Sequence, residues 1–172
     1  MHWLDAQLGT GARGWPNPML FLLFRLGKER YALEASRVLE VLPLLNLRRL
    51  PQAPKGVAGV FNYRGTPVPA VDLSELTLGH PAKERLSTRI IVVNYVDAGG
   101  KHLVGLVAEE ATETLRKEAA EFVPSGVNMR AAPYLGPVLM DNKGPVQWLR
   151  EEGLFSEPIR QVLFSRPALL ES

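Results

Sequence analysis

The chain has 172 residues, of which 46% are hydrophobic and 22% charged, so it is long enough for one compact unit or for two small ones that share a core. Its 20 basic and 18 acidic side chains give a formal net charge of +2, an excess too small to indicate nucleic acid or an anionic membrane as a partner. Cysteine is absent, which excludes disulfides, thiolate metal sites and a cysteine nucleophile and is compatible with a reducing cytoplasm.

The first 18 residues have no basic start followed by an apolar stretch, so they do not read as a secretion signal. We expect residues 1–18 to form a flexible N-terminal arm. The longest apolar run follows, from Met19 to Phe24, and it is far shorter than the roughly 20 residues that a membrane-spanning helix needs. The run predicts a strand buried on both faces and no direct insertion into a membrane.

Strand signals then recur along the chain, and short turns, most of them containing glycine, join them in pairs. Four hairpins are predicted: Met19–Leu26 with Tyr31–Leu33, Val57–Tyr63 with Thr66–Leu73, Arg89–Val96 with His102–Val107, and Tyr134–Met140 with Pro145–Leu149. Short helical segments are predicted at Leu33–Leu42, Ser74–Leu78 and Glu151–Phe155, followed by a C-terminal helical tail over residues 156–172.

Closely spaced strands with turns marked by glycine and proline favour barrels or a sandwich over alternating strand–helix units, so the predicted fold class is mainly β. Pro67 and Pro69 lie two residues apart in one predicted strand, so both ring nitrogens face the same side and neither can donate a hydrogen bond. That side of the strand is predicted to be an edge or a bulge. An irregular loop is the alternative.

The two halves of the chain resemble each other at a constant offset of 73 residues. The matched positions are Leu33, Ala35, Glu40, Leu42 and Pro51 with Leu106, Ala108, Glu113, Leu115 and Pro124. In each half a hairpin, an acidic segment, a proline and a second hairpin follow in the same order. The pattern predicts two similar β subdomains in tandem, with a chance match as the alternative.

The polar residues do not form a recognisable catalytic or metal-binding pattern. The three histidines are scattered at His2, His80 and His102, without metal-ligand spacing. The segment Gly99–Lys101 lacks the rest of a phosphate-binding loop and is typical of a hairpin turn. The acidic pairs Glu109–Glu110 and Glu151–Glu152 are expected to face water or to cap helices. We therefore expect no enzyme activity, no metal and no cofactor.

Residues 59–73 read G-V-F-N-Y-R-G-T-P-V-P-A-V-D-L. This stretch resembles the hallmark of the CheW family, in which a G-V-x-N-x-R-G turn precedes a P-V-x-D-L strand. Residues 21–41 resemble the opening hairpin and the V-x-E-V segment of the family, and Val104–Val107 with Glu109 resembles its later V-G-x-x-V-D strand. The resemblance covers about residues 19–155.

The resemblance implies two intertwined SH3-like five-stranded barrels over residues 19–155, side by side with a groove between them. It also implies a non-catalytic adaptor that couples the cytoplasmic tip of chemoreceptor-like proteins to the regulatory domain of a CheA-type histidine kinase. Such a protein would be cytoplasmic and recruited to membrane receptor clusters. An adaptor of the surface-sensing Wsp pathway is one candidate that the chain resembles.

The same resemblance assigns expected roles to single residues. Expected receptor contacts are Val38, Glu40, Val41 and Val60, and expected residues of the kinase or receptor interface are Asn62 and Arg64. Ordinary core is the alternative for the two valines at 38 and 41, and a solvated turn for Arg64. We also expect Glu40 and Arg64 to form an ion pair. Gly65 is expected to shape the turn, and Asp72 to cap the helix at Ser74–Leu78.

The chain departs from the family pattern in several places. Glu109 and Glu110 stand where the family usually has aspartate and then glycine. In the C-terminal tail, Ile159, Val162 and Leu163 fall on one helical face, with Ser156 as the N-cap. This tail is expected either to pack on the barrels or to bind a separate partner, and we favour packing.

A second class of function is a small-barrel module that binds nucleic acid or a small ligand. Its surface would combine basic clusters with interleaved aromatic side chains. Here Arg48, Arg49 and Arg64 are scattered among acidic residues. The sequence therefore favours the adaptor, with no nucleic-acid partner.

Overall fold

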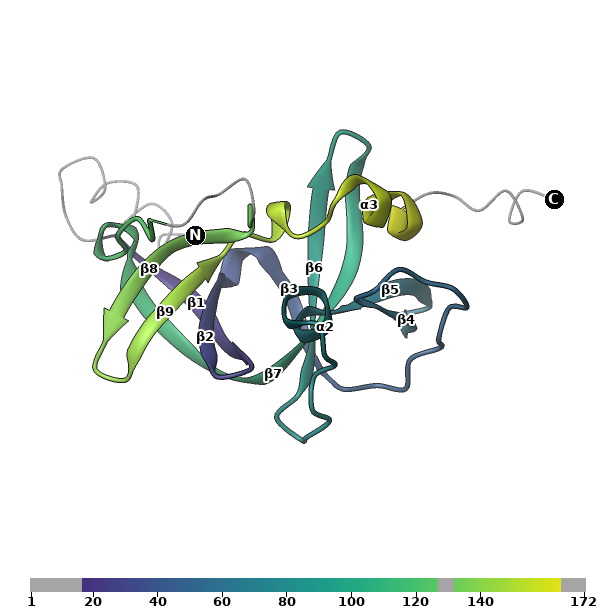
Figure 1. Ribbon diagram of the computed structural model, residues 1–172, viewed down its shortest axis with the longest axis horizontal. Coiled ribbons are helices and arrows are strands. Elements are labelled where there is room, and N and C mark those ends of the chain that lie inside the picture. The colour runs from purple at the N-terminus through teal and green to yellow at the C-terminus, as the bar shows by residue number, and fades with distance from the viewer. Residues whose placement is uncertain (1–16, 127–131, 165–172) are drawn as a thin grey trace.

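The computed structural model describes residues 17–126 and 132–164, which form strands joined by tight turns and a few short helices (Figure 1). The strands are β1 Pro18–Leu26, β2 Glu29–Glu34, β3 Val38–Pro43, β4 Val57–Tyr63, β5 Thr66–Asp72, β6 Arg89–Asp97, β7 Gly100–Glu118, β8 Leu135–Asp141 and β9 Gly144–Leu149. The α-helices are α2 Leu73–Leu78 and α3 Glu157–Phe164, and the 3-10 helices are η1 Ala35–Arg37, η2 Ala119–Glu121 and η3 Glu151–Gly153.

The strands form two five-stranded barrels that share β7. Barrel 1 has the order β3–β6–β7–β5–β4, and a bridge between Arg48 and Val60 closes it. Barrel 2 has the order β7–β1–β2–β9–β8, and a bridge between Val123 and Val138 closes it in the same way. The mainly β fold with two barrel subdomains is therefore confirmed.

The two barrels are intertwined because each takes strands from both halves of the chain. Strands β1 and β2 belong to the first half but lie in barrel 2, whereas β6 and the first part of β7 belong to the second half but lie in barrel 1. Each barrel joins the two contributions through one parallel pair, β5 with β7 and β2 with β9, and one antiparallel pair, β3 with β6 and β1 with β7. The repeat at an offset of 73 residues is thus present, with exchanged hairpins.

Three apolar clusters fill this arrangement. One lies inside barrel 1 around Phe61 and Ile90, and a second lies inside barrel 2 around Phe21 and Trp148. The third and largest, which we call the inter-barrel core, contains Leu22, Phe24, Ile91, Val93, Tyr95 and Leu106 among others. Alternate residues of β1 face barrel 2 and the inter-barrel core, so residues 21–24 are all buried, as the apolar run predicted. The prediction is wrong at the start of the run, where Met19 is partly buried and Leu20 is 39% exposed.

Strand β7 passes from one barrel to the other through a bend. Its residues before Glu109 pair with β6, and its residues from Glu113 onwards pair with β1. At the bend Glu110 has a left-handed backbone with φ of 49°, and its carboxylate lies 3.0 Å from the Arg25 guanidinium. Glutamate therefore occupies a conformation that favours glycine, at the position where the family pattern has glycine.

The four predicted hairpins are confirmed, and most of their strand ends agree within about one residue. One strand, β3, was missed, and β7 was predicted too short. The helix predicted at Leu33–Leu42 is wrong: only η1 is helical there, and β3 follows it along β6. Strand β7 continues for 11 residues beyond the predicted end at Val107, up to Glu118.

The other short helices lie where the sequence placed them. Helix α2 covers the predicted Ser74–Leu78, η3 lies in the predicted Glu151–Phe155, and α3 begins at Glu157 in the predicted tail. Strand β7 pairs with β5 only from Ala70 onwards, so the side blocked by Pro67 and Pro69 is unpaired as predicted. None of the helices in the described ranges is long and apolar enough to cross a membrane.

Candidate functional site

The turn between β4 and β5 places a cation at the tip of barrel 1. Arg64 and Gly65 have φ of 52° and 86°, the left-handed pair that a two-residue hairpin turn needs. The side-chain oxygen Oδ1 of Asn62 accepts a hydrogen bond of 2.8 Å from the Gly65 N–H and fixes the turn. The Arg64 side chain is 75% exposed, so this turn presents it to solvent.

Three side chains converge beside this turn, and we call them the Glu40 cluster: Glu40, Tyr63 and Arg64. The Oε1 atom of Glu40 accepts hydrogen bonds from Arg64 Nη2 at 2.8 Å and from the Tyr63 hydroxyl at 2.9 Å. The Arg64 guanidinium also lies 5.2 Å from the centre of the Tyr63 ring, within cation–π distance. The predicted pair of Glu40 and Arg64 is present.

Tyr63 is the member of the cluster that the sequence analysis missed. Its hydrogen bond to the Glu40 carboxylate raises the pKa of the Tyr63 phenol, because the bond favours the protonated form. Its place next to Arg64 is visible in the sequence, but the direction of its side chain is not.

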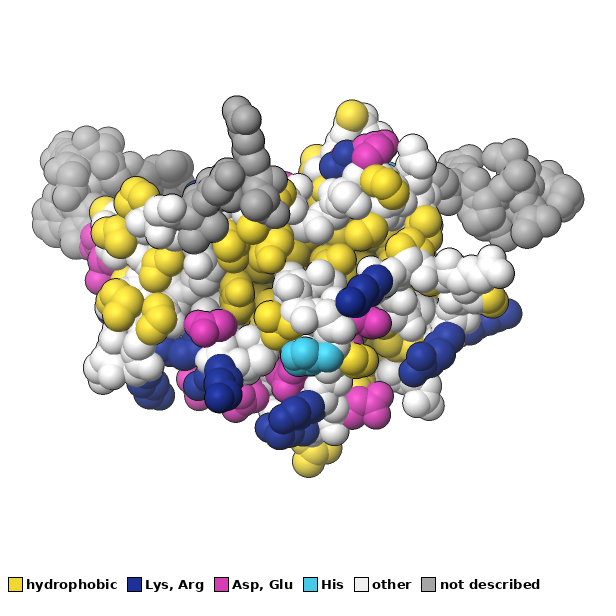
Figure 2. Space-filling view, in the orientation of Figure 1, with side chains coloured by type: hydrophobic (Ala, Val, Ile, Leu, Met, Phe, Trp, Pro, Cys, Tyr) yellow, Lys and Arg dark blue, Asp and Glu magenta, His cyan; other side chains and the backbone are white. Residues whose placement is uncertain are grey.

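Two of the expected receptor-contact valines lie at the surface of the inter-barrel core. Val38 and Val41 are partly buried and pack against that core. Other partly buried apolar residues surround the same core: Leu76, Tyr134, Leu135, Ile159, Leu163 and Phe164. We call these residues, together with Val38 and Val41, the apolar strip. Figure 2 shows hydrophobic side chains gathered between the barrels. Each of the two valines thus packs against the core and leaves part of its side chain exposed to solvent.

Val60 lies elsewhere on barrel 1. Because side chains alternate along a strand and Phe61 points into the barrel, Val60 points outward from β4. Its N–H and carbonyl groups exchange two hydrogen bonds of 2.8 Å with Arg48. The structure therefore does not place Val60 in the strip that contains Val38 and Val41.

Asp72 has the predicted structural role and a second one. Its Oδ1 accepts a hydrogen bond from the Glu75 N–H at 3.2 Å and caps α2. Its Oδ2 accepts a bond of 2.9 Å from the Ala82 N–H, and its own N–H donates to the Gly56 carbonyl at 2.7 Å. Asp72 therefore joins α2, the segment before β4 and the segment before β6.

The prediction for the acidic pairs is wrong for their first members. Glu109 is only 8% exposed and accepts a hydrogen bond from the Ser74 hydroxyl at 3.3 Å. Glu151 is 5% exposed and lies 3.5 Å from the Arg37 guanidinium, and burial raises the pKa of its carboxyl. Each buried acid is held by a residue far away in the sequence, which local patterns do not show.

The C-terminal helix packs on the protein, as favoured. Phe164 stacks against His102 and Tyr95, with ring centres 4.3 and 5.4 Å apart. Val162 is 46% exposed, so the predicted packing face is wrong at that position, and Ile159, Leu163 and Phe164 form the packed face. The stacking of Phe164 on these two rings holds α3 against β6 and β7.

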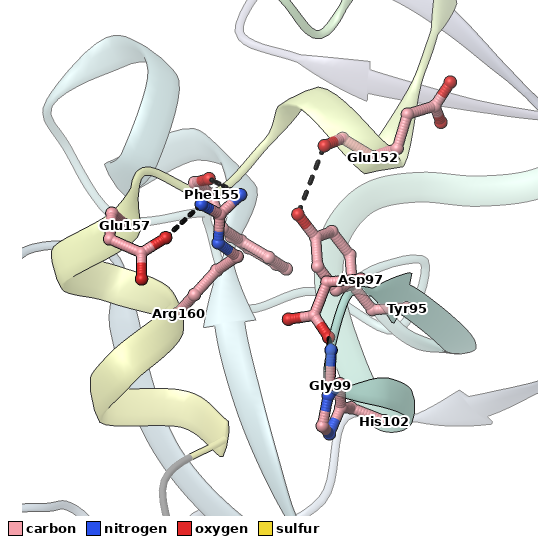
Figure 3. Close-up of polar contacts among 8 residues, drawn as sticks. All are labelled: Tyr95, Asp97, Gly99, His102, Glu152, Phe155, Glu157 and Arg160. Carbon is pink, nitrogen blue, oxygen red and sulfur yellow. Dashed lines mark hydrogen bonds and ion pairs between the residues drawn. The ribbon is translucent and has the colours of Figure 1, made fainter.

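Polar contacts hold the same region together (Figure 3). The Tyr95 hydroxyl donates to the Glu152 carbonyl at 3.1 Å, and Arg160 pairs with Glu157 on α3. His102 Nε2 lies 2.9 Å from Asp97 Oδ1. Burial opposes ionisation of Asp97, but hydrogen bonds from His102 and from the Gly99 N–H outweigh it and lower the pKa.

No group of three histidine, cysteine or acidic side chains in the described ranges is arranged to hold a metal ion. The CheW-like domain model matches residues 20–158. The chain belongs to the CheW-like family.

Comparisons with individual proteins also support membership of the CheW-like family. The chain is 30% identical over 121 residues to the chemotaxis protein CheW of Helicobacter pylori, covering 70% of each protein. It is 30% identical over 112 residues to protein FrzA of Myxococcus xanthus, covering 65% of this chain and 68% of that relative. A solved structure of the scaffolding protein TtCheW from Thermoanaerobacter tengcongensis superposes with a TM-score of 0.72. It covers 85% of this chain and 93% of that one at 22% identity, and supports the fold.

Proposed function

We propose that this member of the CheW-like family is a non-catalytic adaptor that couples chemoreceptor-like proteins to a CheA-type histidine kinase. It would act in the cytoplasm, at receptor clusters. One observation carries the proposal: an apolar strip between the two barrels contains Val38 and Val41, and Glu40 of the hydrogen-bonded cluster lies on the same strand, β3.

This arrangement suits recognition of a helix. An amphipathic helix at a receptor tip can lay its apolar side chains on the partly buried residues of the strip, which gives affinity without chemistry. Val38 and Val41 contribute to such a strip from β3, and Glu40 lies between them in the sequence. The exposed charges of the cluster would then fix the position of the helix more than they add affinity.

The cluster contributes little to folding, which leaves it available for recognition. Exposed ion pairs stabilise proteins by about 0–1 kcal/mol, and the Arg64 side chain is largely in solvent. Binding to a receptor or to the kinase would need an interface of ordinary size, since stable complexes bury about 800 Å² on each partner. An adaptor of this kind works through contact alone.

Co-purification tests the proposal directly. A tagged kinase is incubated with a receptor cytoplasmic fragment, with and without the chain, and we expect receptor on the resin only when the chain is present. Val38→Arg places a charge on the apolar strip and is expected to reduce receptor retention about tenfold or more. Leu86→Arg is the matched control, because Leu86 is 98% exposed in the segment before β6.

Circular dichroism and the melting temperature establish that each variant is folded. A folded Val38→Arg variant that retained receptor and kinase as well as the unchanged chain would contradict the assignment of the strip. A chain that bound neither protein would contradict the proposed function itself.

A further inference from the structure

One end of the apolar strip is formed by a helix that lies on the barrels, and not by the barrels themselves. Three residues of the strip, Ile159, Leu163 and Phe164, belong to α3. They lie on one side of this helix, and all three pack against the inter-barrel core. An amphipathic helix of the chain itself therefore occupies this end of the strip, in the way in which a partner helix would.

The surface under α3 continues the surface on which Val38 lies. Val38 pairs with Val93 on β6, and Tyr95 follows two residues later, so Val93 and Tyr95 both point to the inter-barrel core. Tyr95 is only 2% exposed, because the rings of Phe155 and Phe164 lie 4.9 and 5.4 Å from it. Figure 1 shows α3 beside the β6–β7 hairpin. Departure of α3 would thus uncover the Tyr95 ring on the same surface as Val38.

Helix α3 is held less firmly than the chain that precedes it. None of its eight residues is buried, whereas Leu154 and Phe155, just before it, are 6% and 4% exposed. A helix of this length is marginal by itself, so its packing keeps it folded. The Arg160 guanidinium pairs with Glu157 of the same helix and donates to the Phe155 carbonyl at 3.5 Å. The anchored part of the chain therefore ends at Phe155, and α3 can move about the exposed Ser156.

A cleft lies between α3 and the tip of the β6–β7 hairpin. Its volume is about 590 Å³, and its lining includes Asp97 and His102 from the hairpin and Arg160 and Gln161 from α3. A close-packed interface would leave no such space. The helix thus rests on the barrels mainly through the apolar side chains of one face.

We infer that α3 is a displaceable cover: in the free chain it lies over the Tyr95 end of the apolar strip, and it leaves when an amphipathic helix of a receptor binds there. The receptor helix is identified through the proposed function, on which this part of the inference rests. The opening of α3 is a property of the chain alone. Because a covered site must open before it binds, α3 lowers the affinity for the receptor, and loosening α3 raises it.

Hydrogen exchange measured by mass spectrometry tests the opening in the chain alone. We expect the amides of α3 to exchange at least tenfold faster than those of β6, and Leu163→Ser to accelerate α3 several-fold further without changing β6. Val162→Ser is the matched control on the same helix, because Val162 is 46% exposed, and it is expected to change the exchange less than twofold. An α3 that exchanges as slowly as β6 would overturn the inference, as would equal acceleration by both variants.

The affinity for a receptor cytoplasmic fragment tests the displacement. We expect Leu163→Ser to bind the fragment about fivefold more tightly than the unchanged chain, and Val162→Ser to bind it equally well. Unchanged or weaker binding by Leu163→Ser would overturn the inference, since α3 would then lie away from the receptor or belong to its docking surface. If no variant bound the fragment although α3 opened in hydrogen exchange, the proposed function would be contradicted and α3 would still be supported as a cover.

A crosslink that holds α3 closed should have the opposite effect. The chain has no cysteine, so His102→Cys with Phe164→Cys introduces one pair of thiols, at positions whose rings lie 4.3 Å apart. A short bismaleimide linker joins the two thiols. We expect the linked chain to bind the receptor fragment about fivefold more weakly than the same variant treated with N-ethylmaleimide. Equal affinity of the linked and unlinked forms would overturn the inference.

Discussion

At the scale of single residues, the Glu40 cluster shows how one carboxylate organises a recognition surface. Glu40 accepts from a phenol and from a guanidinium, and a left-handed turn presents both donors. The pair with Arg64 could be predicted because the family motif carries one charge in each segment. Tyr63 could not, since its direction depends on how β3 and β4 meet in the closed barrel.

The hydrogen bond of Tyr63 gives a prediction for pH. Because its phenol has a raised pKa, the bond to Glu40 is present below the ordinary tyrosine pKa of about 10 and is lost only at higher pH. We expect the difference in ultraviolet absorbance between the chain and Tyr63→Phe to titrate above pH 10. Glu40→Gln should move that titration down. A Tyr63 that titrates like free tyrosine in both backgrounds would contradict the contact.

The left-handed Glu110 gives a prediction for stability. A side chain at positive φ costs about 1–2 kcal/mol, and glycine avoids that cost, whereas alanine keeps it. Both changes remove the exposed pair with Arg25, which is worth little. We expect Glu110→Gly to be more stable than Glu110→Ala by about 1 kcal/mol in urea unfolding. Equal stability of the two variants would mean that the bend is not strained.

At the scale of secondary structure, alternation and turn residues predict hairpins well, but they do not identify strands whose pattern is interrupted. Strand β3 has a bulge between Val38 and Glu40, which shifts the alternation and makes the segment resemble a short helix. The continuation of β7 was missed for a similar reason, since the register of its pairing with β1 shifts near Glu110. Only the pairing with distant strands shows that these segments are extended.

One ion pair joins the two hairpins of barrel 2, β1–β2 and β8–β9. Arg30 in β2 donates to both carboxylate oxygens of Asp141 in β8, at 2.8 and 2.9 Å, and both side chains are largely buried. These hydrogen bonds from Arg30 lower the pKa of Asp141 from 3.8 to about 2. A two-pronged contact of this kind fixes the two hairpins relative to each other.

This pair predicts a pH-dependent contribution to stability. Because the pKa of Asp141 is lower in the folded chain, the contribution is present above pH 4 and is lost as the pH falls toward 2. We expect Asp141→Asn to lower the free energy of unfolding by roughly 2 kcal/mol at pH 7. In urea titrations the two proteins should converge near pH 2. A difference that stayed constant with pH would contradict this reading of the ion pair.

At the scale of the whole molecule, the exchange of hairpins makes two barrels into one unit. The internal repeat predicted two similar subdomains in tandem, but residue patterns alone do not tell which hairpin completes which barrel. The family resemblance implied that the barrels are intertwined. The pairing of β1 with β7 shows how, because it places a first-half strand in barrel 2. Since β7 runs through both barrels, neither can unfold without disrupting the other.

This coupling can be measured with a core substitution. Ile90→Ala leaves a cavity in barrel 1 and should cost about 3 kcal/mol, because Ile90 is fully buried. Trp148 reports on barrel 2, in a background with Trp3→Phe and Trp15→Phe. We expect its fluorescence to follow the same single transition as circular dichroism, at lower urea in the variant. Two separate transitions would show that the barrels unfold independently.

The most direct test of the adaptor account is a charge exchange in the Glu40 cluster. Co-purification measures how much receptor fragment and kinase are retained by Glu40→Arg, by Arg64→Glu and by the double variant. We predict that each folded single variant loses most of its retention of at least one partner, and that the double variant recovers part of it because the ion pair can form again. Recovery should be incomplete, since Tyr63 loses its carboxylate acceptor. Single variants that bind both partners like the unchanged chain would contradict the account.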